Sequence, residues 1–253
     1  MKLYAIAINT FREAIRDRIL YLILVFALIM IGAGRAISLL TVGSEEKIMK
    51  DMGLAAISLF GVATAIFVGV GLVFKEIEKR TIYVLIAKPI RRSEFILGKY
   101  LGLALVLFVN LSIMTLGFYA VLWYKGFLDV TLGKAIVLIF VELLLITAIA
   151  IFFSSFSSPF LSSLFTVTSY LIGHLSWGLP LLADKLQSGP GRALCVVLYR
   201  VLPNLEYLNI KGEVVHGVPI GGEQVLLAAG YGLLYTALVL MLAIGVFRRR
   251  DFV

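Results

Sequence analysis

The sequence predicts an all-helical integral membrane protein, and three observations support that fold class. Of its 253 residues, 61% are apolar and 15% are charged, whereas soluble domains contain about 45–50% apolar and about 25% charged residues. The mean hydropathy is +1.03. Several uncharged stretches are long enough to cross about 30 Å of hydrocarbon as a helix. The composition excludes a disordered chain, and the single cysteine, Cys195, excludes a disulfide scaffold.

We expect one transmembrane domain over residues 1–253, beginning with an interfacial helix. Residues 1–18 place apolar side chains at helical spacing and carry four basic residues before any long apolar run. This pattern favours an amphipathic helix in the membrane interface over a cleavable signal peptide. A solvated basic leader is the alternative.

Six membrane spans follow, each bounded by charge or by turn residues. The expected spans are 19–40, 52–74, 100–124, 135–153, 160–183 and 224–247. The first requires the Arg35 side chain to extend to the interface. The fourth and fifth divide one apolar run at the serine-rich turn before Pro159. Rows of small residues in the second and sixth spans, at Gly61 and Gly232 among others, indicate packing seams within one chain or between two.

The excess of basic residues is divided unequally between the two faces. The face with both termini, the 75–99 loop and the 154–159 turn carries 14 Lys and Arg against 6 Asp and Glu. The opposite face carries 9 against 8. The positive-inside rule therefore places both termini in the cytoplasm of a multi-pass protein of the cell membrane. The net charge of +8 is a topological signal, and it does not require nucleic acid as a partner.

The cytoplasmic loop 75–99 is the most informative segment outside the spans. It begins with alternating charge, continues through the apolar block 82–87, and contains Pro89, which ends a helix. Ser93 followed by Glu94 is typical of an N-cap for the third span. A short apolar helix flanked by seven cationic residues should bury itself against lipid headgroups or another subunit. The opposite loop, 184–223, is turn-rich, with one short helix expected over 193–202.

Ionisable residues inside the membrane are candidates for a functional site. Glu142 and His174 fall at similar depth on consecutive antiparallel spans, and Asn110 lies near mid-membrane. The functional hypothesis is that Glu142 and His174 face a translocation path or pair across it. The structural alternative is that Glu142 and His174 only fix helix packing. For Asn110, the structural alternative is a hydrogen bond that joins two helices.

Across nearly the whole chain, these features resemble the ABC-2-type permeases, the membrane subunits of ATP-binding-cassette exporters. The resemblance depends on the interfacial helix, six spans, Glu78-x-x-Thr81 and Ala87-x-Pro89-x-x-Arg92-x-x-Phe95-x-x-Gly98-Lys99. Leu202-Pro203-Asn204 and the tail 247–252 resemble the multicopper-enzyme-maturation permease branch. By resemblance, residues 81–92 form a coupling helix and the 154–159 turn makes a second contact. The implied ATPase-docking residues are Glu78, Thr81, Tyr83, Val84, Leu85, Ala87, Pro89, Arg91 and Arg92.

The resemblance implies a transporter subunit powered by a partner. No Gly-x-x-x-x-Gly-Lys-[Ser/Thr] motif occurs in the chain, so ATP and Mg²⁺ are expected on a separate ATPase subunit. We expect no cofactor or metal on this chain, no enzymatic activity, and a second permease copy as partner, with the path at the dimer interface. Closure of two ATPase subunits would push the 81–92 helix and drive alternating access. The alternatives are a proton-coupled secondary transporter and a non-transporting anchor for a protein complex.

Overall fold

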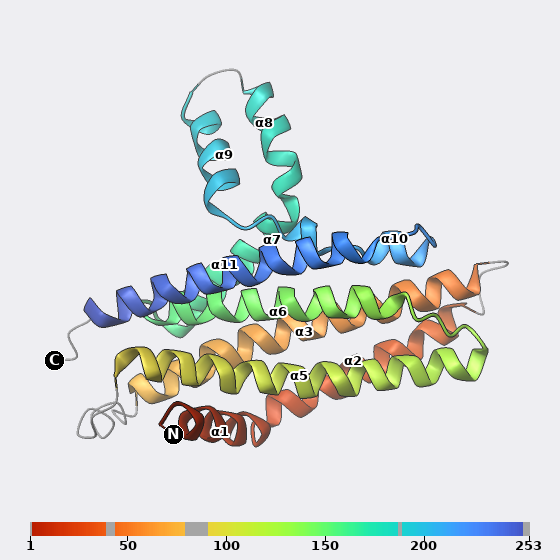
Figure 1. Ribbon diagram of the computed structural model, residues 1–253, viewed down its shortest axis with the longest axis horizontal. Coiled ribbons are helices and arrows are strands. Elements are labelled where there is room, and N and C mark those ends of the chain that lie inside the picture. The colour runs from red at the N-terminus through yellow and green to blue at the C-terminus, as the bar shows by residue number, and fades with distance from the viewer. Residues whose placement is uncertain (1, 39–43, 79–90, 187–188, 250–253) are drawn as a thin grey trace.

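The computed structural model describes residues 2–38, 44–78, 91–186 and 189–249, which contain helices and turns and no strand. Its longest helices lie side by side in a bundle, with α1 and the end of α11 at the same end (Figure 1). The α-helices are α1 (Lys2–Ile15), α2 (Arg18–Ser38), α3 (Glu45–Glu78), α5 (Arg92–Lys125), α6 (Leu132–Ser154), α7 (Pro159–Leu175), α8 (Leu179–Lys185), α9 (Pro190–Val201), α10 (Lys211–Val215) and α11 (Gly222–Arg249). Two short 3-10 helices, η1 (Ser176–Gly178) and η2 (Leu205–Leu208), lie between them.

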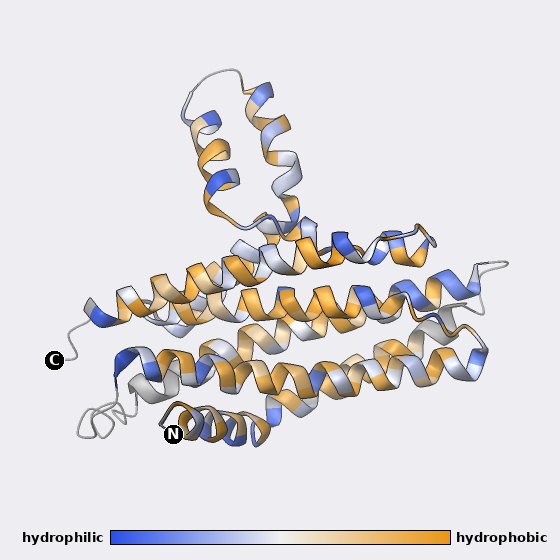
Figure 2. Ribbon diagram, viewed as in Figure 1, coloured by the Kyte–Doolittle hydropathy of each residue, from blue (hydrophilic) through white to orange (hydrophobic). Residues whose placement is uncertain are grey.

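Among the described residues, four helices are long and apolar enough to cross a membrane, which confirms the membrane class. They are Glu45–Gly71, Arg92–Lys125, Leu132–Ser154 and Gly222–Arg248. The last three contain the third, fourth and sixth predicted spans, and the first covers most of the second, 52–74. Apolar residues fill the middle of the bundle helices, and hydrophilic residues gather at their ends (Figure 2). At 1.5 Å per residue, α5 alone is about 50 Å long, so it extends beyond about 30 Å of hydrocarbon.

Helix α6 is the centre of the bundle. In both α3 and α6, 72% of the most apolar window is buried, against 28% in α11. Both predicted small-residue seams face α6: a Cβ on Gly61 would lie 2.8 Å from Leu143, and one on Gly232 would lie 2.5 Å from Val141. The seams therefore pack helices within one chain.

The fifth predicted span differs from the structure. The sequence predicts continuous helix over 160–183, but α7 ends at Leu175 and a 3-10 turn leads into α8. Pro180 stands in the first turn of α8, where its missing N–H costs nothing, and there it begins a new helix instead of continuing the old one. Helices α8 and α9 form a hairpin that projects from the side of the bundle (Figure 1). The expected helix over 193–202 is α9.

Helix α1 packs against the first turns of α5. A Cβ on Gly102 would lie 2.6 Å from the Ala7 carbonyl oxygen, so only glycine allows this approach of the two backbones. The predicted N-cap at Ser93 is wrong: α5 begins at Arg92 with Arg91 as its N-cap. The Glu94 carboxylate accepts a hydrogen bond from the Arg91 backbone N–H at 2.9 Å, which satisfies one free donor of the helix start.

Ion pairs hold the opposite end of the bundle together. Lys50 Nζ on α3 lies 2.8 Å from Asp129 Oδ2 in the loop before α6, and Lys125 pairs with Glu45. Burial raises the pKa of the Asp129 carboxyl, but hydrogen bonds from Lys50 and Thr131 outweigh it and lower the pKa to about 2. The carboxylate is thus stabilised in its charged form by the fold.

Candidate functional site

The candidate site is centred on Glu142, in the most buried part of the bundle. Its side chain is 1% exposed on α6, among the apolar residues that make this helix the core. A carboxylate at such a position is costly unless another group pairs with it.

His174, near the end of α7, supplies that partner. Its Nε2 lies 2.7 Å from Glu142 Oε1, and its Nδ1 lies 3.3 Å from Glu206 Oε2 on η2. Both ring nitrogens are therefore engaged, which fixes the orientation of the imidazole between two carboxylates. The sequence places Glu142 and His174 at similar depth, and the structure brings them into contact.

Ser58 and Tyr170 extend this polar cluster to α3 and α10. The Tyr170 ring, one turn before His174, lies edge-on to the imidazole with centroids 4.7 Å apart. Its side chain lies near Ser58, which accepts a hydrogen bond from Lys211 Nζ at 3.0 Å. Five elements, α3, α6, α7, η2 and α10, thus meet through polar side chains in an apolar bundle.

Asn204 connects the same region to α11. Its side-chain oxygen accepts the Glu206 backbone N–H at 3.0 Å, and its own backbone N–H donates to the Tyr231 hydroxyl at 2.9 Å. Movement of α11 would therefore be transmitted to η2, and through Glu206 to His174.

An imidazole between two carboxylates can do two things chemically. It can hold three helical elements in one arrangement through hydrogen bonds, and it can accept and release a proton between its two neighbours. Because Glu142 is enclosed and Glu206 is 42% exposed, the pair connects the buried centre to the surface of the loop region.

Asn110 lies apart from this cluster. It is buried in the seam between α5 and α3, where its Nδ2 donates to Thr64 Oγ1 at 2.9 Å. The contact is of the kind that joins helices in membranes.

The predicted docking residues are only partly within the described structure. Thr81, Tyr83, Val84, Leu85, Ala87 and Pro89 lie outside it, as does the Glu78 side chain. Arg91 is exposed. Arg92 contacts this chain itself: its Nη1 donates to the carbonyl oxygens of Phe247 and Arg248, at 3.1 and 2.7 Å.

This contact joins the start of α5 to the end of α11. The Arg92 guanidinium satisfies carbonyls that the last turn of α11 leaves free, at the negative end of its dipole. The Phe95 and Phe247 rings stack beside it with centroids 5.7 Å apart. The segment that follows residues 79–90 is therefore mechanically connected to α11.

Several residues of the cluster are missing from the sequence prediction. Tyr170 precedes His174 by four residues, so both lie on one face of α7, and this spacing was a signal available in the sequence. Ser58, Glu206 and Lys211 carried no such signal, since only the fold brings the loop residues to α3 and α7.

Comparison with known proteins identifies one family. The sequence model described as ABC-2 family transporter protein matches residues 4–252, almost the whole chain. No curated protein compared with the chain matches it significantly.

Proposed function

The chain belongs to the ABC-2 family of transporter proteins, and from this premise we propose that it is the permease subunit of an ATP-driven exporter. It is a membrane protein, and the part of the chain that the structure describes contains four helices long and apolar enough to span. The family match over residues 4–252 is the observation that carries the proposal. A separate ATP-binding-cassette subunit would hydrolyse ATP, with Mg²⁺, at the cytoplasmic face.

The proposed topology has six spans, with α2 and α7 as the first and fifth and α1 in the cytoplasmic interface. The charge asymmetry between the two faces supports this orientation in the cell membrane. The opposite end of the bundle, with Asp129, would then face outward.

The proposed coupling runs from the docking segment through α11 to the polar cluster. An ATPase that moves residues 81–92 would move Arg92, which contacts the last turn of α11. Tyr231 on α11 accepts a hydrogen bond from Asn204, beside Glu206 and His174. Rearrangement of α7 against α6 would then break and remake the contact between His174 and Glu142.

Two finer assignments belong to the same proposal. A second permease copy would complete the translocation path, and Glu142 and His174 would line it. The resemblance of Leu202-Pro203-Asn204 and of the tail 247–252 to the multicopper-enzyme-maturation branch supports membership of that branch.

Co-purification tests the proposal. The tagged chain is co-expressed with each ATP-binding-cassette ATPase subunit of the same genome, as wild type, as Leu85→Asp and as the control Glu223→Gln at the opposite end. We expect one ATPase to co-purify with the wild type and the control, and to be lost from Leu85→Asp. If no ATPase co-purifies, the proposal is contradicted. The remaining hypothesis is then a non-transporting anchor for a protein complex.

A second candidate is a proton-coupled carrier, favoured by the chain Glu142–His174–Glu206. The two candidates differ in energy source. A carrier loses activity when a protonophore collapses the proton gradient, whereas an ATP-driven exporter in vesicles with sealed-in ATP does not.

A further inference from the structure

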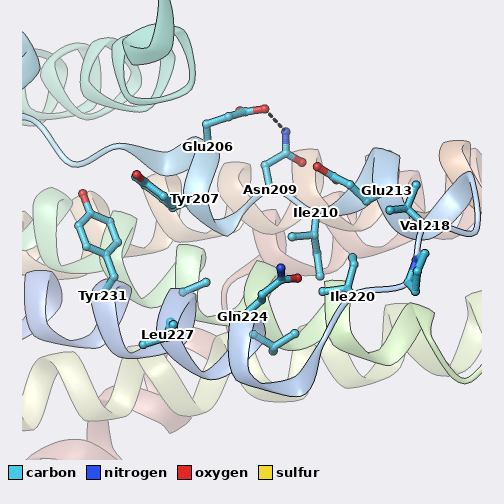
Figure 3. A pocket seen from close by; sticks show the side chains of 13 residues that line it. Glu206, Tyr207, Asn209, Ile210, Glu213, Val218, Ile220, Gln224, Leu227 and Tyr231 are labelled. Atoms are coloured by element: carbon cyan, nitrogen blue, oxygen red, sulfur yellow. Dashed lines mark hydrogen bonds between the residues drawn. The ribbon is translucent and has the colours of Figure 1, made fainter.

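A cavity of about 620 Å³ lies between the η2–α10 segment and the first turns of α11. Figure 3 shows Tyr231, Leu227 and Gln224 of α11 facing Tyr207, Asn209 and Ile210 across it. Much of the wall is apolar, including Ile210, Val218, Ile220 and Leu227. This volume is within the usual range for binding sites of small organic molecules.

One wall of the cavity is rich in hydrogen-bond acceptors. Glu206, Asn209 and Glu213 follow one another along it (Figure 3). Asn209 Nδ2 donates to Glu206 Oε1 at 3.0 Å, and this bond fixes the amide orientation because a carboxylate accepts and cannot donate. Asn209 Oδ1 is consequently left buried with no partner among the described residues. The acceptors of this wall that a ligand can reach are therefore the carboxylates.

The charge of the cavity is opposite to that of the chain. The chain has a net charge of +8, yet the described residues that line the cavity include two glutamates and no lysine or arginine. Two lysines lie outside the lining: Lys134 Nζ donates to the carbonyl of the lining residue Ile220 at 2.7 Å, and Lys211 donates to Ser58. Both Glu206 oxygens have partners, whereas the Glu213 carboxylate has none among the described residues.

Two aromatic rings close one end of the cavity. The Tyr207 and Tyr231 centroids lie 5.7 Å apart, and the Asn204 N–H bonded to the Tyr231 hydroxyl holds the second ring in place. Tyrosine faces attract cations and also provide apolar contact.

We propose that this cavity binds a protonated amine on an apolar body, with the N–H groups on the Glu213 carboxylate and the body against the aliphatic wall. This deepens the proposed function, on which it rests, by naming the class of cargo that the permease handles at its outer side. The Glu206 side chain lines the cavity and also contacts His174. It therefore connects a ligand in the cavity to the buried contact between His174 and Glu142.

The test uses three probes of similar size and different charge. Binding of 1-naphthylmethylammonium, 1-naphthylmethanol and 1-naphthylacetate is measured by titration calorimetry with the full chain in zwitterionic lipid nanodiscs, with empty nanodiscs subtracted. No ATPase is present, so the result does not depend on the docking proposal. We expect the ammonium to bind at least about tenfold more tightly than the alcohol, with the acetate weakest.

Two substitutions and a matched control locate the binding. Glu213→Gln should weaken the ammonium about fivefold or more, and Glu213→Lys should abolish its preference and favour the acetate. Glu223→Gln, which removes a carboxylate that does not line the cavity, should leave binding unchanged. Three results would each overturn the proposal: all three probes bind equally, none of them binds, or Glu213→Gln and Glu223→Gln have equal effects. If the ammonium binds but no ATPase co-purifies, the cavity assignment stands and the permease proposal fails.

Discussion

The contact between Glu142 and His174 should be energetically coupled, and a double-mutant cycle measures this directly. Glu142 is 1% exposed and its carboxylate lies 2.7 Å from the imidazole. Removal of His174 leaves the carboxylate buried without this hydrogen bond, and removal of Glu142 leaves His174 with Glu206 alone. Breaking a buried pair in soluble proteins costs about 3–5 kcal/mol. Hydrogen bonds between membrane helices average about 0.6 and reach about 1.7 kcal/mol. We therefore predict that Glu142→Ala and His174→Ala each destabilise by about 2 kcal/mol, with a coupling energy of about 1–1.5 kcal/mol.

The assay is equilibrium unfolding in mixed micelles, followed by circular dichroism for both single variants and the double variant. The matched control is His216→Ala, because His216 is exposed and bonds only the Gly212 carbonyl of its own helical turn. The control should change the free energy of unfolding by less than about 0.5 kcal/mol. Single effects that add within about 0.3 kcal/mol would refute the reasoning, because independent sites behave in that way.

Three further predictions concern the two ends of the bundle. Folding lowers the pKa of the Asp129 carboxyl from 3.8 to about 2. The charged carboxylate therefore stabilises the folded state by about 2 kcal/mol at most above about pH 4, and this contribution is lost as the pH falls through about 2. The melting temperature of wild type should therefore approach that of Asp129→Asn on acidification; a constant gap between pH 6 and pH 2 would contradict this. Arg92→Gln should speed amide exchange in the last turn of α11 by about tenfold, since it removes a charge-assisted bond worth about 1.5 kcal/mol, while Arg91→Gln has no such effect. Gly102→Leu should destabilise by at least about 2 kcal/mol through its clash with α1. Gly71→Ala, with open space at its Cβ, should be neutral or slightly stabilising, and equal melting temperatures for these two glycine variants would refute the close approach.

Composition and periodicity were enough to predict the membrane class and four long helices. Uncharged stretches of about 20 residues have few alternatives to a spanning helix, because the lipid satisfies no backbone hydrogen bond. The boundary at Leu175 was not predictable from hydropathy, since Leu179 and Leu182 continue the apolar run beyond it. The position of Pro180 was the relevant local signal, because a proline in a first turn begins a helix.

The candidate site was predictable only where helix geometry alone determines position. Glu142 and His174 could be brought to one depth because each lies in a regular helix with a fixed rise per residue. Glu206 and Asn209 lie in a turn-rich loop, whose path over the bundle no spacing rule determines. The acceptor wall of the cavity therefore emerged from the structure. Arg92 shows the reverse case: a basic residue in a predicted docking loop turned out to bind carbonyls of its own chain.

The most direct test of the central claim is ATP hydrolysis by the reconstituted complex. The permease and its co-purifying ATPase are placed in lipid nanodiscs, and ATP turnover is measured for wild type, Leu85→Asp and His216→Gln. Addition of the permease should change the turnover of the ATPase at least about threefold, and His216→Gln should behave as wild type. Leu85→Asp should return the turnover to that of the ATPase alone. Turnover that is the same with wild-type permease, with Leu85→Asp and without any permease would contradict the claim that this chain is the membrane partner of an ATPase.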